Sequence, residues 1–285
     1  MRVDKSTLSA WFGSDVARKV EEAVRRCGAS IEGRSKEECI EGFSAEDAAF
    51  YKETLGVLEA LEVEGFEDAG ENTGRYGNPS FRVFHRGVME RVDARLDKEE
   101  LRKYVWYSLG DPKRLDYGSG HELCFFLFLV AKSFLDSGRV LFLPVFVLFC
   151  GYIGIAQRVQ TKFRLEPAGS KGVWGFDDYQ FLSFYFGASQ MVGRDEFSPP
   201  RMCFDQTMVE QHKGQFLYMA SVSFVLSNKG PDFRRHSPCL FQETKNPDWS
   251  IVRENIFQLF LEGVLAKHQA IHHIEFGGIV SAMEM

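Results

Sequence analysis

Two adjacent carboxylates, those of Asp177 and Asp178, end a loop that is rich in glycine. Read along the chain, this loop contains Gly169, Gly172, Trp174 and Gly175. Glycine lets a backbone approach a ligand closely, and a large ring in a polar loop is more typical of a site than of a connection. Adjacent carboxylates suit a hard cation such as Mg²⁺. The loop is therefore a candidate binding site for a metal ion or a charged ligand.

A structural role accounts for the same two acids. Asp177 and Gln180, three residues apart before an apolar run, have the spacing of a capping box at a helix start. This role is compatible with binding, because a helix start preceded by glycines exposes free N–H groups at the positive end of the helix dipole. We therefore expect a helix over residues 177–192 whose start could also receive an anion.

The segment 114–122, RLDYGSGHE, repeats this arrangement ahead of a second apolar run. Ser119 and Glu122 again have capping-box spacing. Three familiar motifs fail here. No Gly-Lys-Ser/Thr ends a phosphate loop, Tyr117 replaces the first glycine of a nucleophile elbow, and Phe125 replaces the second histidine of a zinc-binding His-Glu-x-x-His. What remains is two glycine-rich helix starts, one near an arginine and one near paired aspartates, which together could bind a metal–phosphate group.

These segments resemble the signature segments of a known family, the phosphotyrosyl phosphatase activators, which act on serine/threonine protein phosphatase 2A. The two long segments are 114–122 and 166–180 (EPAGSKGVWGFDDYQ). A third, 75–82 (RYGNPSFR), is similar to the family's Arg-Phe-Gly-Asn element, and a fourth, 271–277 (IHHIEFG), is similar to its C-terminal element. The order and spacing of all four agree with the family from about residue 44 onward.

The resemblance implies a compact all-α fold of several helices, divided into core, linker and lid subdomains. It implies binding of ATP with Mg²⁺, binding of the catalytic subunit of phosphatase 2A, and a peptidyl-prolyl cis–trans isomerase activity. Carried over position by position, it assigns the nucleotide to Arg114, Ser119, Gly120, His272, His273 and Ile274. It assigns the Mg²⁺ ion to Gly172 and Asp178.

For the isomerase activity, the resemblance implies a groove that binds a proline-containing peptide. Rotation about an X-Pro bond has a barrier of about 18–20 kcal/mol and needs no covalent step, so a groove that desolvates and twists the imide suffices. We expect Trp174 and Tyr179 to form walls of this groove with Asp177 beside them, and Phe184 to belong to the core. A homodimer induced by the peptide stays open.

The chain departs from the family at four positions. Ser119 replaces threonine and keeps a hydroxyl, and Ser183 stands where proline is usual. His272 replaces glutamine and Ile274 replaces an aromatic residue, so the C-terminal part of the expected nucleotide site differs most. Two other classes stay open. One is a module that docks on the phosphatase without catalysis, and the other is an independent ATP hydrolase, which the lack of a Walker pattern disfavours.

The composition agrees with a helical globular protein. The 285 residues are 45% hydrophobic and 26% charged, with 27 phenylalanines and only 9 prolines. We expect a single domain over 1–285, with a subdomain boundary near 62–80, where the sequence is acidic and glycine-rich. A net charge of −6 argues against nucleic acid as a partner, because nonspecific binding needs a basic surface. Six scattered cysteines without a C-x-x-C pair predict reduced thiols.

The expected location is the cytoplasm, with the nucleus as a second compartment, because the first residues are charged and lack the apolar stretch of a secretion signal. The uncharged stretch 140–156 approaches the roughly 17–25 residues of a membrane span. It contains Pro144 and two glycines, and Gln157 and Arg158 follow it directly. We therefore expect a buried helix and no membrane partner.

Hydrophobic periodicity predicts helices throughout, without the alternating pattern typical of strands. Gly28 is expected to end the first helix, and Ser44 with Asp47 to open the next. Asp205 and Asp248 are expected to cap two long helices. The expected helices, with a loop at 228–247, cover residues 8–27, 44–61, 81–96, 101–109, 120–137, 139–163, 177–192, 205–227 and 248–268.

Overall fold

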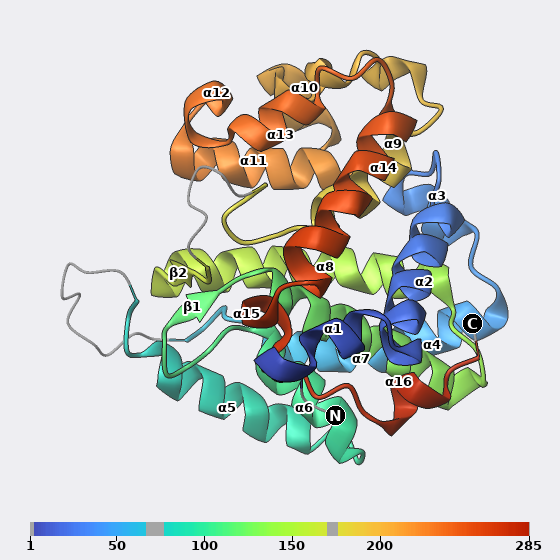
Figure 1. The fold of residues 1–285 in the computed structure, drawn as a ribbon, viewed down its shortest axis with the longest axis vertical. Helices are drawn as coiled ribbons and strands as arrows, with labels where there is room; N and C mark the ends of the chain where they lie inside the picture. The colour runs from blue at the N-terminus through green and yellow to red at the C-terminus, as the bar shows by residue number, and fades with distance from the viewer. Residues whose placement is uncertain (1–2, 67–76, 170–175, 285) are drawn as a thin grey trace.

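The computed structural model describes residues 3–66, 77–169 and 176–284, which fold almost entirely into helices (Figure 1). The all-α prediction is confirmed. The α-helices are α1 (Leu8–Phe12), α2 (Asp15–Ser30), α3 (Lys36–Glu41), α4 (Ala45–Leu61), α5 (Phe81–Asp93), α6 (Glu99–Ser108), α7 (Ser119–Ser137), α8 (Phe142–Phe163), α9 (Leu182–Met191), α10 (Gln206–His212), α11 (Leu217–Lys229), α12 (Phe233–His236), α13 (Pro238–Glu243), α14 (Trp249–Phe260), α15 (His268–Ile271) and α16 (Gly278–Ala282). Short 3₁₀-helices cover Lys5–Thr7, Asp195–Phe197 and Pro200–Phe204, and a π-helical turn covers Leu261–Leu265.

Helices α7 and α8 run through the middle of the molecule as a hairpin (Figure 1). Every residue of α7 from 120 to 133 is buried, because α6 packs on it from one side and α8 from another. Helices α10 to α13 gather at one end of the molecule, and α14 runs from this end back toward the middle (Figure 1). Helix α9 connects the two regions, because it packs against α11 and α14 as well as against α2 and α7.

Helix α8 is, within the described ranges, the one helix whose length and composition would allow it to cross a membrane. It packs against α2, α3, α4 and α7, and residues along most of its length are buried. This placement is the one expected for a core helix. The six cysteines are all free thiols, as the composition predicts.

Helix caps that depend on neighbouring residues follow the sequence prediction. The Ser44 hydroxyl accepts from the Asp47 amide at 3.1 Å, and the Asp47 carboxylate accepts from the Ser44 amide at 2.9 Å. The carboxylate of Asp205 accepts from the Met208 amide at 3.0 Å and so caps α10. The Asp248 carboxylate caps α14 in the same way.

Several helix boundaries differ from the prediction. Gly28 does not end a helix but lies inside α2, where a Cβ atom would come within 2.7 Å of the Tyr185 hydroxyl, so the glycine allows α2 to approach α9. The helix capped by Asp205 breaks after His212 and restarts at Leu217. The expected loop at 228–247 contains α12 and α13, which are too short to show a clear period.

One small pair of strands accompanies the helices, and the sequence pattern did not indicate it. Strand β1 (Asp116–Tyr117) pairs in parallel with β2 (Glu166–Pro167). A pair of two-residue strands has no alternating pattern to read, so it was invisible in the sequence.

Candidate functional site

The β1–β2 pair brings the two long signature segments side by side. The amide of Glu166 donates to the Leu115 carbonyl at 2.9 Å, and the amide of Ala168 donates to the Tyr117 carbonyl at 2.6 Å. A Cβ atom on Gly118 would lie 2.9 Å from the Ala168 side chain, so a glycine is required for this approach. The segments that the sequence singled out therefore form one continuous region at the start of α7.

The start of α7 is covered by the C-terminal part of the chain. Gly118 is the N-cap residue and Ser119 the first residue of the helix. A Cβ atom on Gly120 would collide with the Ala270 carbonyl oxygen and lie 2.7 Å from Cε1 of His273. The structure thus brings Ser119, Gly120 and His273 close together.

Glu122 does not form the predicted capping box with Ser119. Its side chain is fully buried and accepts from the amides of Phe181 at 2.7 Å, Leu182 at 2.8 Å and Ser183 at 2.9 Å. Burial raises the pKa of Glu122 to about 8, although the three N–H groups act in the opposite direction. Glu122 of α7 therefore caps α9, and the free N–H groups expected at that helix start are already satisfied.

The helix expected from residue 177 begins five residues later, at Leu182. The Asp177 carboxylate accepts from the amides of Tyr179 and Gln180, both at 3.0 Å, and so holds the turn before α9. Burial raises the pKa of Asp177 above its usual value. Asp177 thus caps a turn as its spacing predicts, but no helix follows directly, and the Gln180 side chain donates to Gln160 instead of completing a capping box.

Asp178 faces a cation of the protein itself. Its Oδ2 atom lies 2.5 Å from the Lys229 ammonium at the end of α11. No three His, Cys, Asp or Glu side chains converge on a metal position in the part of the chain that the structure describes. Asp178 could supply one carboxylate to Mg²⁺, which commonly needs only one or two when phosphate oxygens complete its shell. Gly172, expected at the Mg²⁺ ion, and Trp174, expected in the wall of the peptide groove, lie outside the described residues.

Arg114 is oriented by two neighbouring acids. Its Nε atom lies 2.9 Å from Oδ2 of Asp116 and 3.4 Å from Oδ2 of Asp111, while 46% of the side chain stays exposed. The next residue, Leu115, has a φ of 59°, which is uncommon for a residue other than glycine. Such backbone conformations gather at functional sites, where the surrounding structure holds them in place. Arg114 is therefore fixed in place by two carboxylates while much of its side chain stays accessible to solvent.

A cluster of polar side chains, with His121 buried and Asp116 and His273 half-buried, lies beside Arg114. We call Asp116, His121 and His273 the polar cluster. His121 is 2% exposed, its ring centroid lies 4.6 Å from that of His273, and its Nε2 atom lies 3.9 Å from Oδ1 of Asp116. Burial lowers the pKa of His121 to about 4 and also lowers that of His273, so both rings are neutral near pH 7. Asp116 Oδ1 and His121 Nε2 are buried without a hydrogen-bond partner in the described structure. Such atoms fit a site that takes a polar ligand.

The other two C-terminal candidates are not members of this cluster, although the His272 ring centroid lies 5.3 Å from that of His273. Nδ1 of His272 is 3.2 Å from the His268 carbonyl and 3.1 Å from the Gln269 carbonyl, so it is held by its own helical turn. Ile274 is fully buried in the hydrophobic core. The sequence did not single out Asp116 or His121 as ligand-facing residues, although both stand within the 114–122 segment.

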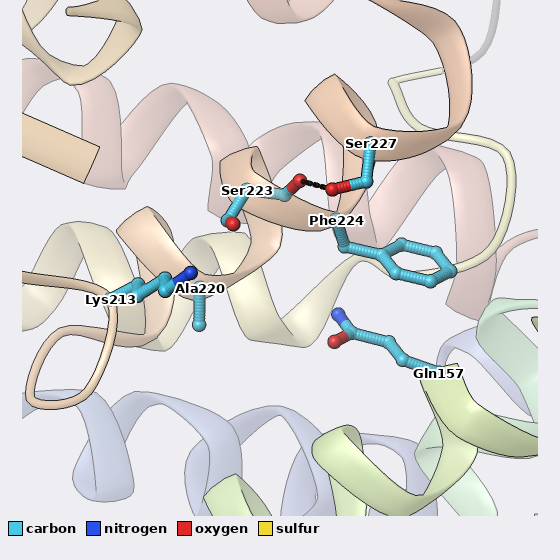
Figure 2. A pocket seen from close by; sticks show the side chains of 6 residues that line it. All are labelled: Gln157, Lys213, Ala220, Ser223, Phe224 and Ser227. Carbon is cyan, nitrogen blue, oxygen red and sulfur yellow. Dashed lines mark hydrogen bonds between the residues drawn. The ribbon is translucent and has the colours of Figure 1, made fainter. Parts of the chain in front are cut away.

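A pocket lies between α8 and α11 (Figure 2), and one of its lining residues, Phe224, packs near Tyr179. The Tyr179 hydroxyl donates to the Leu165 carbonyl at 2.8 Å, and its ring centroid lies 6.3 Å from that of Phe224. The pocket has a volume of about 300 Å³ and is lined by Gln157, Lys213, Ala220, Ser223, Phe224 and Ser227. Phe184 is 1% exposed and belongs to the core, as expected.

Comparison with known proteins points to the same family as the signature segments described above. Residues 2–282 match the family model described as "Phosphotyrosyl phosphate activator (PTPA) protein". Serine/threonine-protein phosphatase 2A activator 2 of Mycosarcoma maydis is 30% identical over 299 residues, which cover 98% of this chain and 64% of that protein. Serine/threonine-protein phosphatase 2A activator of Drosophila melanogaster is 29% identical over 259 residues, which cover 85% of this chain and 65% of that protein.

The fold has a solved counterpart. The crystal structure of the PP2A phosphatase activator Ypa1 superposes with a TM-score of 0.79 at 26% identity, covering 96% of this chain and 91% of that one. The chain spans less than two thirds of the length of the two curated relatives named above. The family model nevertheless covers nearly every residue, and the chain belongs to the phosphotyrosyl phosphatase activator family.

Proposed function

We propose that this protein activates serine/threonine protein phosphatase 2A by engaging its catalytic subunit, with ATP and Mg²⁺ as cofactors. Two observations support the proposal. The relatives are named as activators of this phosphatase, and the β1–β2 pair joins the two signature segments at the start of α7. The second observation carries most weight, because residues from distant parts of the chain converge there on buried polar atoms that have no hydrogen-bond partner among the described residues.

Each candidate residue has a defined task in this proposal. The guanidinium of Arg114 would bind phosphate by charge-assisted hydrogen bonds. The backbone at Ser119 and Gly120 would approach the nucleotide at the positive end of α7. Asp178 would bind the Mg²⁺ ion, which neutralises phosphate charge when it is present. Asp177 would keep Asp178 in place by holding the turn before α9.

In the described conformation, the candidate residues contact other parts of the protein at the positions where a nucleotide would bind. Arg114 is paired with Asp111 and Asp116, Asp178 is paired with Lys229, and α15 lies against Gly120. A nucleotide that bound here would replace each of these contacts with a contact of its own. We infer that nucleotide binding replaces internal ion pairs, which favours a role in activation over rapid turnover.

The substitutions Arg114→Ala and Asp178→Ala test the nucleotide site. Each should weaken binding of ATP with Mg²⁺ by about 10- to 100-fold, since a hydrogen bond to a charged group contributes roughly 1.5–3 kcal/mol. Binding is measured by calorimetry, and activation by the recovery of activity of an inactive phosphatase 2A catalytic subunit. Circular dichroism should show unchanged helical content.

The exposed Glu90 provides a matched control, and Glu90→Ala should change neither affinity nor activation. Unfolding of the Arg114 and Asp178 variants would mean that both residues are structural. Docking and activation that are insensitive to both substitutions would favour a non-catalytic docking module. Steady ATP turnover by the isolated chain would favour a hydrolase.

A peptidyl-prolyl isomerase activity is the second proposed function, and the pocket of Figure 2 supports it. Phe224 supplies an apolar wall that contacts Tyr179, and the Nε2 atom of Gln157 is buried without a partner among the described residues. An apolar wall next to an amide donor suits a proline ring followed by a carbonyl oxygen. We therefore propose this pocket as the peptide groove.

Truncation of the groove wall tests this second function. Phe224→Ala should reduce the catalysed isomerisation of a proline peptide by about 10-fold or more, because the ring packing that orients the peptide is lost. ATP affinity should stay unchanged. The measurement is a protease-coupled or NMR exchange assay at fixed peptide concentration. An unchanged rate in a folded variant would place the peptide elsewhere.

A further inference from the structure

The pocket between α8 and α11 has two chemically different ends (Figure 2). Phe224 of α11 faces Gln157 of α8 at one end, and Lys213 lies beside Ala220 at the other. Four of the six lining residues are three or four positions apart on α11 and so share one face of that helix: Ala220, Ser223, Phe224 and Ser227. This face therefore connects an apolar end of the pocket to a cationic end.

The ammonium group of Lys213 has hydrogens left for a ligand. It lies 2.7 Å from Oε2 of Glu210, and the two side chains are 43% and 64% exposed. An ammonium group has three hydrogens, so this one ion pair does not use all of them. Exposed ion pairs contribute only about 0–1 kcal/mol, so a carboxylate of a ligand can join or replace Glu210 at little cost.

The distance between the two ends matches a short stretch of extended peptide. Ala220 and Phe224 are four residues apart on α11, which corresponds to about 6 Å along the helix. Two residues of extended chain span about 7 Å. A peptide whose proline ring packs on Phe224 therefore places the residue two positions away beside Lys213.

Gln157 determines the direction of this peptide. Its Nε2 atom is buried without a hydrogen-bond partner in the described parts of the chain, and it lies at the Phe224 end of the pocket (Figure 2). In the proposed groove it donates to the carbonyl oxygen that follows the proline. The residues that precede the proline then extend toward Lys213.

The charge of this end of the molecule favours an acidic peptide. Residues 201–245 supply five of the six lining side chains and contain six Lys or Arg against four Asp or Glu. The whole chain, in contrast, has a net charge of −6. A locally positive surface on an acidic protein attracts acidic segments and repels basic ones.

We propose that the groove selects peptides that carry an acidic residue two positions before the proline, and that Lys213 binds the carboxylate of that residue. This inference deepens the isomerase function proposed above and rests on it. Lys213 lies at the end of the pocket away from Phe224, where the imide bond would rotate. It therefore determines the choice of peptide and does not act on the rotating bond.

NMR exchange with three peptides, acetyl-Ala-Xaa-Ala-Pro-Phe-amide with Glu, Gln or Lys at Xaa, tests the proposal on the full chain. All three contain the same Ala-Pro bond, so the variable residue is not part of the imide that rotates. The kcat/KM for the Glu peptide should exceed that for the Gln peptide by about 3- to 5-fold, the upper range for an exposed ion pair. The Lys peptide should be the slowest, and the preference should shrink as NaCl is raised from about 0.05 to 0.5 M.

Variants of Lys213 assign the preference to its charge. Lys213→Met removes the charge at similar length, and it should bring the Glu and Gln peptides to within about 1.5-fold of each other. Lys213→Glu should reverse the order, so that the Lys peptide becomes the fastest. Lys52→Met is the matched control, because Lys52 is an exposed lysine of α4 that does not line the pocket, and this variant should keep the preference for Glu.

Equal turnover of the three peptides by the unmodified protein would overturn the inference and leave the isomerase function standing. A preference for Glu that survives in folded Lys213→Met would also overturn it, since the carboxylate would then be bound elsewhere. If no peptide is isomerised faster than in buffer, the proposed isomerase function fails and this inference fails with it.

Discussion

Replacing Glu122 with alanine is expected to lower the midpoint of thermal unfolding by roughly 6–12 °C. The carboxyl group of Glu122 accepts from three buried amides at the start of α9, and its removal leaves all three without a partner. At about 1 kcal/mol for each unsatisfied donor, the lower limit for such groups, the loss is about 3 kcal/mol. For a chain of this size, 1 kcal/mol corresponds to about 2–4 °C.

Differential scanning calorimetry at pH 6 measures this loss, with the exposed Glu90→Ala as the matched control. The pH dependence gives an independent check. Because the pKa of Glu122 is raised to about 8, its contribution to stability is fully present below about pH 4.5 and is lost as the pH rises through 8. The alanine variant should lack this part of the slope. A midpoint within 1 °C of the unmodified protein (roughly the size of a typical surface effect) would show that α9 does not depend on Glu122.

Gly120→Ala is expected to displace α15 and to destabilise the protein by roughly 1–3 kcal/mol, the usual cost of forcing extra atoms into a packed contact. The added Cβ collides with the backbone oxygen of Ala270, which cannot rotate away as a side chain could. Hydrogen exchange measured by mass spectrometry should become faster in the peptide that contains α15. Nucleotide affinity should fall in the same variant, since the start of α7 is altered.

Gly56→Ala is the matched control. Gly56 lies within α4, and a Cβ atom there meets nothing within 4 Å, so the substitution should be neutral or stabilising by up to about 1 kcal/mol. Unchanged exchange at α15 in Gly120→Ala, together with normal stability, would mean that the C-terminal segment is not seated on α7.

The helix starts show which parts of the structure can be read from sequence. Ser44, Asp205 and Asp248 were read correctly because each acts on amides two or three residues away. Glu122 has the same local spacing to Ser119, yet its partners lie 59 to 61 residues further along the chain. Local pattern cannot distinguish a carboxylate that caps its own helix from one that is buried against another.

The candidate site also combines features that local sequence indicates with features that depend on tertiary structure. The segments containing Arg114, Ser119 and Gly120 could be located because their residue types are unusual for loops. Their pairing through β1 and β2, and the contact between Gly120 and His273, depend on tertiary structure and have no local signature. Asp116 and His121 each bury a polar atom that has no partner within the described ranges, and this burial depends on the packing of α15 over the start of α7.

The lengths of α7 and α8 determine how the two signature segments align with each other. Helices of 19 and 22 residues separate β1 from β2, and each added residue would advance a helix by about 1.5 Å and turn it by about 100°. One insertion within α8 would therefore carry Glu166 away from the carbonyl of Leu115 and uncouple the segments. Insertions at residues 138–141, at the far end of the hairpin, would leave this alignment intact. Changes of length between the two segments should thus be confined to that turn.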